Sequence, residues 1–294
     1  MRKGDAVTGR QVLILANPRA GTGRSHRLVE GLIRALRRHQ LHPTVCWQRE
    51  ELSDRLGTLP AEEVRCVVAA GGDGTLLEVV NRAPQVPAAL LPLGNENLVA
   101  EFCRLRRDPR LLADLIAAGR TRQLDLARAN GRLFCLMASA GLDADVVHRV
   151  HRRRRGHISR LSYLVPMLQA LQHYSYPLVE ATVDETGERL RGALVFVFNL
   201  PLYGLRLPIA AEARPDDGLL DLYVFERPGL ANLARYLAAL ALGGRDRLPD
   251  FRHRRVCRVV LASAPPAPVQ TDGDPAGCLP LTVEVVPRAL TLVR

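Results

Sequence analysis

Lysine is almost absent from this chain of 294 residues. Lys3 is the only one, so arginine supplies nearly all of the basic charge behind a net charge of +11. A Gly-x-x-x-x-Gly-Lys-Ser/Thr phosphate loop needs a lysine away from the terminus. The phosphate site of protein kinases and Schiff-base catalysis need one as well. The sequence therefore excludes these three kinds of site. If phosphates bind to this protein, glycine amides, arginine or a metal ion must hold them.

Long apolar runs and paired cysteines are also missing. The longest apolar candidate, Gly192 to Leu205, is shorter than the ~20 residues of a membrane-spanning helix and contains Asn199 and Pro201. The six cysteines are scattered without a Cys-x-x-Cys pair, which favours buried, reduced thiols over a metal site. The first residues lead into a strand pattern rather than a signal peptide. We therefore expect a cytoplasmic protein, peripheral at most on the inner membrane face.

One glycine-rich corner organises the chain. The segment Gly71-Gly72-Asp73-Gly74-Thr75 follows an apolar run, Val64 to Ala70, and precedes a helical pattern. Glycines let backbone N–H groups approach a phosphate, and a helix N-terminus favours negative charge. A phosphate would repel Asp73 unless a metal ion lies between them. The corner therefore indicates nucleotide phosphates with Mg²⁺, with an ordinary strand–turn–helix corner as the alternative.

Two further loops follow predicted strands in the same way. Asn17-Pro18-Arg19-Ala20-Gly21 follows the strand Gln11 to Ala16, and Gly94-Asn95-Glu96-Asn97-Leu98 follows the strand Ala88 to Leu93. Strands alternate with helical patterns up to about residue 120. This alternation predicts an open α/β sheet that binds its ligand at the carboxyl ends of the strands.

The pattern changes after residue 120. Strand patterns such as Leu178–Asp184, Arg189–Phe198 and Leu219–Phe225 follow without helical crossovers, and Thr186-Gly187 reads as a hairpin turn. We expect an α/β nucleotide-binding domain at residues 1–120 and a β-rich, sandwich-like domain at residues 121–294. The last strands either complete the second domain or return to the first.

The Gly71–Thr75 segment resembles the signature of the diacylglycerol kinase catalytic superfamily. That superfamily includes bacterial lipid kinases, sphingosine kinases and, more distantly, NAD kinases and phosphofructokinases. The loop at Asn17 resembles a family Asn-Pro-x-x-Gly segment. The loop at Gly94 and Asn97 resembles another family loop, in which Asn95 replaces a threonine and Leu98 replaces a carboxylate.

The resemblance implies a Rossmann-like nucleotide domain, a β-sandwich-like lipid-substrate domain with inserted helices, and an active site in the cleft between them. It implies ATP and Mg²⁺ as cofactors. The residues expected to bind ATP are Asn17, Gly21, Gly71, Gly72, Asp73, Gly74, Thr75, Gly94, Asn95 and Asn97.

Acidic segments later in the chain extend the resemblance. Leu124-Asp125-Leu126 resembles a family segment whose aspartate joins the metal network, so Asp73 and Asp125 are expected to organise the metal. The segment around Asp217-Gly218 resembles an element that holds a structural Mg²⁺, which implies the Asp217 side chain with the carbonyls of Arg214 and Leu219. Spacing alone favours a simple Asp-Gly turn there.

The segment Asp272-Gly273-Asp274 resembles the family's Asp-Gly-Glu. The resemblance implies that Asp274 is the general base, which takes the proton from the lipid hydroxyl. An aspartate reaches one methylene less than a glutamate, and a base must come within about 2.6–3.2 Å of its proton, directly or through water. Asp272 is an alternative member of the metal network.

A run of four arginines, Arg152 to Arg155, precedes an apolar helical pattern that contains Tyr163. The run is either a solvated segment or a patch that binds anionic lipid. Nucleic acid is the least favoured partner, because aromatic residues make up only 4% of the chain. The apolar helix either flanks a lipid entrance or is a core helix. A homodimer is left open.

These features predict an ATP- and Mg²⁺-dependent kinase that phosphorylates a hydroxyl of diacylglycerol or a related long-chain lipid alcohol at a membrane surface. Two alternatives remain. Asn95, Leu98 and Asp274 depart from the family pattern, which leaves room for a non-catalytic nucleotide- or lipid-binding relative. A kinase of a soluble acceptor such as NAD is the other, and the apolar helix and the arginine run argue against it.

Overall fold

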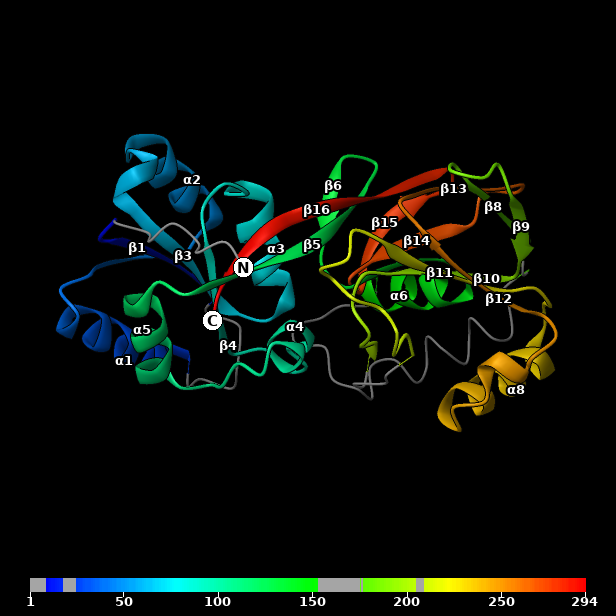
Figure 1. Cartoon of the computed structure of the whole chain (residues 1–294), viewed down its shortest axis with the longest axis horizontal. Coiled ribbons are helices and arrows are strands. Elements are labelled where there is room, and N and C mark those ends of the chain that lie inside the picture. The colour runs from blue at the N-terminus through cyan, green and yellow to red at the C-terminus, as the bar shows by residue number, and fades with distance from the viewer. Residues whose placement is uncertain (1–8, 18–24, 153–174, 176, 205–208) are drawn as a thin grey trace. The chain divides into compact units, whose positions relative to one another are not determined.

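The computed structural model describes residues 9–17, 25–152, 175, 177–204 and 209–294 (Figure 1). The chain divides into two units, Met1–Asp125 with Pro287–Arg294, and Leu126–Val286. The divisions fall inside two strands, β5 (Thr121–Ala129) and β16 (Leu281–Val293), which therefore belong to both units. None of the helices described in these ranges is long and apolar enough to cross a membrane.

The first unit is built on a parallel sheet. Its strands lie in the order β2 (His42–Cys46), β1 (Gln11–Ala16), β3 (Val64–Gly71) and β4 (Ala88–Pro92). The end of β16 adds a fifth strand, since Leu292 pairs in parallel with Ala88. The three central strands are almost completely buried, as strands of a parallel sheet covered on both faces must be.

Helices cover both faces of this sheet. Helices α1 (Ser25–Arg38) and α5 (Pro109–Ala118) pack against each other, and their apolar side chains share one core with alternate residues of β1, β3 and β4. Helices α2 (Arg49–Thr58) and α3 (Asp73–Arg82) contact β1 and β3, and Figure 1 shows them on the other side of the sheet. The short elements η1 (Ala61–Glu63) and α4 (Leu98–Phe102) complete the unit.

The second unit contains a six-stranded antiparallel sheet. Its order is β12 (Phe251–Val256), β11 (Leu220–Phe225), β10 (Leu194–Phe198), β7 (Met137–Gly141), β14 (Pro268–Thr271) and β15 (Asp274–Cys278). Another antiparallel set joins the start of β16 to β13 (Arg258–Ser263), β8 (Val179–Val183) and β9 (Arg189–Gly192), and β6 (Arg132–Phe134) pairs with β5. Helix α6 (Leu142–Arg152) packs on β7, β14 and β15.

The predicted fold class, an α/β unit joined to a β-sandwich-like unit with inserted helices, is confirmed. Two local features differ from what the sequence predicted. The two strands expected at Leu281–Val286 and Leu290–Val293 are one strand, β16, in which Arg288 has a φ of 55°. Helix α8 (Leu230–Ala241) between β11 and β12 was not predicted at all.

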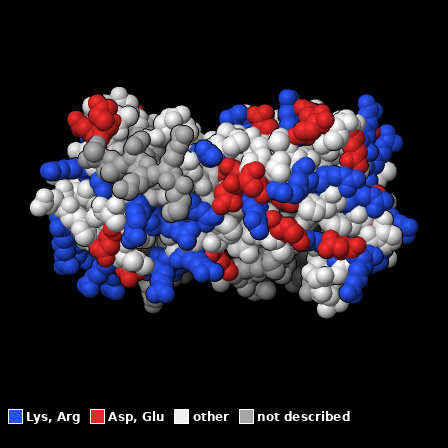
Figure 2. Space-filling model, viewed as in Figure 1, with Lys and Arg blue, Asp and Glu red and all other residues white. Residues whose placement is uncertain are grey.

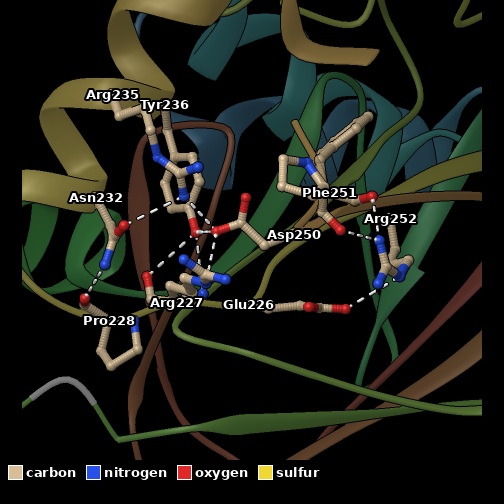
Figure 3. Close-up of polar contacts among 10 residues, drawn as sticks. Glu226, Arg227, Pro228, Asn232, Arg235, Tyr236, Asp250, Phe251 and Arg252 are labelled. Carbon is tan, nitrogen blue, oxygen red and sulfur yellow. Dashed lines mark hydrogen bonds and ion pairs between the residues drawn. The ribbon is translucent and has the colours of Figure 1, made fainter. Parts of the chain in front are cut away.

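The inner side of α8 is fixed by a cluster around Asp250 (Figure 3). The Tyr236 hydroxyl donates to the Asp250 carboxylate at 2.6 Å, and the Arg235 guanidinium forms an ion pair with the same oxygen. Burial by itself raises the pKa of Asp250, but the bonds from Tyr236 and Arg235 outweigh it, so the net pKa lies below the usual range. The cluster therefore ties the helix to the start of β12.

We expect Asp250→Asn to destabilise the second unit by about 1.5–3 kcal/mol at neutral pH, because a charged acceptor is lost. The pKa of Asp250 is lower in the folded protein than in the unfolded chain, where it is about 3.9. The charged carboxylate therefore stabilises the fold fully above the unfolded pKa. This stabilisation is lost as the pH falls through the folded pKa. The difference between wild type and variant should therefore shrink below about pH 4. Urea unfolding measured across acidic pH tests this, with the exposed Asp246→Asn as control. A difference that is constant with pH contradicts it.

Candidate functional site: the glycine edge and the Asp274 hollow

Three of the predicted binding loops meet at one edge of the parallel sheet. Ala16 pairs with Ala70, and Gly71 pairs with Pro92, so β1, β3 and β4 end side by side. The Asn17 N–H donates to the Ala70 carbonyl at 3.1 Å. The structure thus brings together Asn17, the Gly71–Thr75 segment and the Gly94–Asn97 loop. Gly21 lies outside the described residues.

Two glycines at this edge, Gly71 and Gly94, have no space for a side chain. A Cβ on Gly94 would lie 2.6 Å from the Gly72 Cα and 2.8 Å from Asn97 Oδ1, and a Cβ on Gly71 would overlap the Thr75 side chain. The two loops after β3 and β4 therefore need glycine to approach each other. We call this the glycine edge, comprising Gly71, Gly72 and Gly94.

The glycine edge opens directly into a helix. Gly72 is the N-cap of α3, and it offers no side chain to the N–H groups of the first turn, where Asp73 and Gly74 lie. The first N–H groups of a helix have no partner within the helix, so they are available to an anion. This geometry is suited to a phosphate group.

Two side chains fix the shape of the loop after β4. Asn97 Oδ1 accepts the Gly94 N–H at 2.9 Å, and its Nδ2 donates to the Gly94 carbonyl at 2.7 Å. Arg107 donates from Nε to the Pro92 carbonyl at 2.7 Å and from Nη2 to the Gly94 carbonyl at 3.1 Å. Arg107 thus brings a positive charge to the glycine edge. Arg107 was not among the residues predicted from the sequence, because it is 13 residues from Gly94 in a segment without a motif.

Asp73 connects the two loops. Its carboxylate accepts the N–H groups of Leu98 at 2.8 Å and Val99 at 3.1 Å, which open α4. Burial raises the pKa of Asp73 more than these two hydrogen bonds lower it. Leu98, which stands in place of a family carboxylate, contributes its backbone N–H here, and its side chain is buried.

Asp125 is held in a similar way. It is buried in β5, and its carboxylate accepts the Arg288 N–H at 2.7 Å, at the residue where β16 has positive φ. Within the described ranges no group of three or more His, Cys, Asp and Glu could hold a metal ion. The expected metal network of Asp73 and Asp125 stays a prediction.

The Asp217 turn leads into β11. One carboxylate oxygen of Asp217 accepts the Leu219 N–H at 3.1 Å, and the other forms an ion pair with Arg255. Gly218, between Asp217 and Leu219, has a φ of 75°. These are the contacts of an Asp-Gly turn stabilised by its own side chain. The structural Mg²⁺ expected at Asp217, Arg214 and Leu219 stays a prediction.

The two aspartates of the Asp272-Gly273-Asp274 segment have different environments. Asp272 and Gly273, with φ of 51° and 83°, form the two-residue turn between β14 and β15, as type I′ hairpins require. The Asp272 carboxylate accepts three backbone N–H groups, from Cys135, Leu136 and Met137, at 2.7–3.0 Å. Asp272 therefore has a structural role: its carboxylate is the hydrogen-bond acceptor for the segment that leads into β7, which begins at Met137.

Asp274 is the accessible carboxylate of the pair. Its side chain is 51% exposed, and Oδ1 lies 3.5 Å from Nε2 of His151 in α6. An open surface hollow of about 540 Å³ borders two neighbours of Asp274, His151 and Pro275, and is lined by Asp145, His148, His151, Arg152, Pro268, Pro275 and Cys278. We call it the Asp274 hollow. The sequence analysis missed its two histidines, although Asp145, His148 and Arg152 have the i, i+3, i+7 spacing of one helix face.

We expect Asp272→Asn to lower the midpoint of thermal unfolding by about 5–10 °C, because an amide cannot accept all three N–H groups. Asp274→Asn should leave the midpoint unchanged and serves as the matched control two residues away. Circular dichroism melting curves measure both. Equal midpoints for the two variants would show that Asp272 is not the structural acceptor.

The chain matches two family models. The model of the diacylglycerol kinase catalytic domain matches residues 11–129, and that of the YegS C-terminal NAD kinase beta sandwich-like domain matches residues 137–294. The glycine edge lies in the first match, and the Asp274 hollow lies in the second.

Individual relatives are similar along nearly the whole chain. A protein of Mycobacterium tuberculosis (strain ATCC 25618 / H37Rv) named diacylglycerol kinase is 28% identical over 97% of this chain and 95% of its own length. A diacylglycerol kinase of Staphylococcus aureus (strain MRSA252) is 25% identical over 91% of this chain and 87% of its own length.

Solved structures share the fold. The crystal structure of a diacylglycerol kinase from Bacillus anthracis str. Sterne superposes with a TM-score of 0.69 at 19% identity, over 97% of both chains. Another structure from the same organism gives a TM-score of 0.75 at 22% identity, again over 97% of both chains. Together, the two family models and the named relatives support a lipid kinase-like function. The chain therefore belongs to the diacylglycerol kinase family, with a diacylglycerol kinase catalytic domain followed by a YegS-type, NAD kinase-like β-sandwich domain.

Proposed function

We propose that this protein is an ATP-dependent kinase that phosphorylates the hydroxyl of a lipid alcohol, with diacylglycerol as the first candidate. The observation that carries the proposal is the glycine edge. Its loops approach each other without side chains at the uncapped start of α3, in a chain that belongs to the diacylglycerol kinase family.

The residues at the glycine edge suit the phosphates of ATP. The backbone N–H groups at the start of α3 attract an anion, and Arg107 supplies the positive charge that lysine gives in other kinases. Mg²⁺ is commonly bound by one or two carboxylates together with the nucleotide's own phosphates, so it needs no large cluster of protein ligands. Asp73 and Asp125 are the carboxylates we assign to it. When bound, the metal would neutralise charge on the phosphates.

Asp274 has the chemistry required of the general base. In the proposed reaction the lipid O–H bond breaks and its proton passes to the Asp274 carboxylate. The lipid oxygen forms a bond to the γ-phosphorus of ATP while the bond to the bridging oxygen breaks, which releases ADP. The Asp274 carboxylate is exposed, whereas the neighbouring Asp272 carboxylate is occupied by three N–H groups. Of these two carboxylates, only that of Asp274 can take up a proton without breaking hydrogen bonds to backbone N–H groups.

A lipid acceptor is favoured over a soluble one. The relatives from M. tuberculosis and S. aureus are named diacylglycerol kinases, and a net charge of +11 suits an anionic membrane surface. Most of the arginine run proposed to bind anionic lipid, Arg153 to Arg155, and the apolar helix near Tyr163 lie outside the described residues.

The test is transfer of the labelled γ-phosphate of ATP, with Mg²⁺, to a panel of lipid alcohols in mixed micelles, with NAD as the soluble acceptor. The proposal expects a labelled lipid, first among them phosphatidate from diacylglycerol. Labelled NAD without a labelled lipid would support the soluble-acceptor alternative. Nucleotide binding without any transfer would support a non-catalytic relative.

A further inference from the structure

Helix α8 exposes an apolar face. Leu230, Leu237 and Leu242, the residue that caps its C-terminal end, are 55%, 53% and 85% exposed, and they account for half of the exposed large hydrophobic residues in the described chain. At 100° per residue they lie on one side of the helix together with three exposed alanines. We call this the α8 face: Leu230, Ala231, Ala234, Leu237, Ala238 and Leu242.

Helix α8 has an inner apolar side, as a surface helix usually does, with the Tyr236 ring buried against Phe225 and Leu233 and Leu240 half-buried. Its polar residues point inward (Figure 3). Tyr236 bonds to Asp250 and accepts the Arg227 N–H at 3.0 Å, and Asn232 donates to the Pro228 carbonyl at 2.8 Å. These inner contacts fix the helix without using Leu230, Leu237 or Leu242, which stay exposed on the other side.

Both signs of charge lie beside the α8 face. Arg227, whose side chain is 63% exposed, precedes the helix and lies 3.5 Å from the Asp250 carboxylate. Arg247 and Asp246 are exposed after the helix, and Arg245 is buried and paired with Glu212. Where Figure 1 places α8, Figure 2 shows uncharged surface with basic and acidic side chains at its border. An apolar strip next to the exposed Arg227 and Arg247, on a chain with a net charge of +11, complements a bilayer with anionic headgroups.

We propose that the α8 face docks the second unit onto an anionic lipid bilayer, with α8 lying in the plane of the interface and its leucines in the acyl region. A second copy of the chain fits less well. A 12-residue helix is roughly 18 Å long, so a strip one helix wide buries on the order of 200 Å². A stable interface buries about 800 Å² per partner. Two copies would also each bring a net charge of +11.

This proposal does not depend on kinase activity, because vesicle binding can be measured without nucleotide. The full chain is sedimented with vesicles of phosphatidylcholine mixed with phosphatidylglycerol, and with vesicles of phosphatidylcholine alone. We expect binding to the mixed vesicles, weakened about tenfold or more by Leu230→Glu with Leu237→Glu, since two buried leucines are lost. The control is Leu111→Glu, at a 38% exposed leucine of α5. Thermal unfolding verifies that each variant folds.

A second measurement reports insertion directly. Trp47 is the only tryptophan, so Trp47→Phe with Leu237→Trp places a single reporter on the α8 face. Its emission should shift to the blue with mixed vesicles, and lipids with brominated acyl chains should quench it. Unchanged emission, or equal vesicle binding by wild type and the double glutamate variant, overturns the proposal. So does a wild-type dimer, seen by sedimentation velocity, that the glutamates convert to monomer, because a second copy would then cover the face.

Discussion

Replacing Asp274 with asparagine is expected to lower the rate of lipid phosphorylation by about 10²–10⁴-fold, the usual contribution of a general base. An amide cannot take the hydroxyl proton. Because the side chain is exposed and its one described partner is His151 at 3.5 Å, the fold should not depend on it. Single-turnover transfer of the labelled γ-phosphate to diacylglycerol measures the effect, with ATP binding measured separately by calorimetry.

Two further variants make that result specific. Asp274→Glu restores the residue of the family pattern and should retain activity, since it keeps the carboxylate. Asp114→Asn, at an exposed aspartate of α5, should leave the rate unchanged. Transfer that survives Asp274→Asn would remove this residue as the base, without bearing on whether the protein is a kinase.

Replacing Gly94 with alanine should weaken ATP binding about 10- to 100-fold, since one hydrogen bond to a charged group contributes about 1.5–3 kcal/mol. The added Cβ would lie 2.6 Å from the Gly72 Cα, so the loops after β3 and β4 must move apart. The same overpacking should destabilise the first unit by about 1–3 kcal/mol. Calorimetric titration with a non-hydrolysable ATP analogue measures the binding.

The matched control is Gly57→Ala in α2. A Cβ there meets nothing within 4 Å, and alanine is the better helix former, so stability should hold or rise. If Gly94→Ala binds the analogue as tightly as Gly57→Ala does, the glycine edge is not the phosphate site. If both lose binding, the assay reports a general loss of folded protein.

Local sequence determined much of the first unit. The apolar runs of β1 and β3 predicted strands, and the two ends of helix α5, Pro109–Ala118, are marked in the sequence itself. That helix is capped by Asp108 and ends at Gly119 in the left-handed conformation, so both signals are local. The glycine loops were predictable for the same reason, because close backbone approach requires glycine at the loop itself.

Long-range partners could not be predicted. Asp272 and Asp274 look alike in the sequence, and only the fold shows that one accepts N–H groups from residues about 135 positions earlier. Arg107 and His151 also acquire their roles through neighbours distant in the sequence. Helix α8 escaped prediction because its leucines and alanines do not separate into an apolar inner side and a polar outer side, the usual signature of a surface helix.

The arrangement of β16 has a consequence for how the protein is made. Pro287–Arg294 complete the first unit: Leu292 pairs with Ala88, Arg288 donates to Asp125, and the Arg294 N–H donates to the Arg120 carbonyl at 2.9 Å. A ribosome synthesises these residues only after the whole of the second unit. Domains usually fold from the N-terminal end as they are synthesised. Here the N-terminal unit must wait for the end of β16, so its parallel sheet is completed only after the second unit has been synthesised.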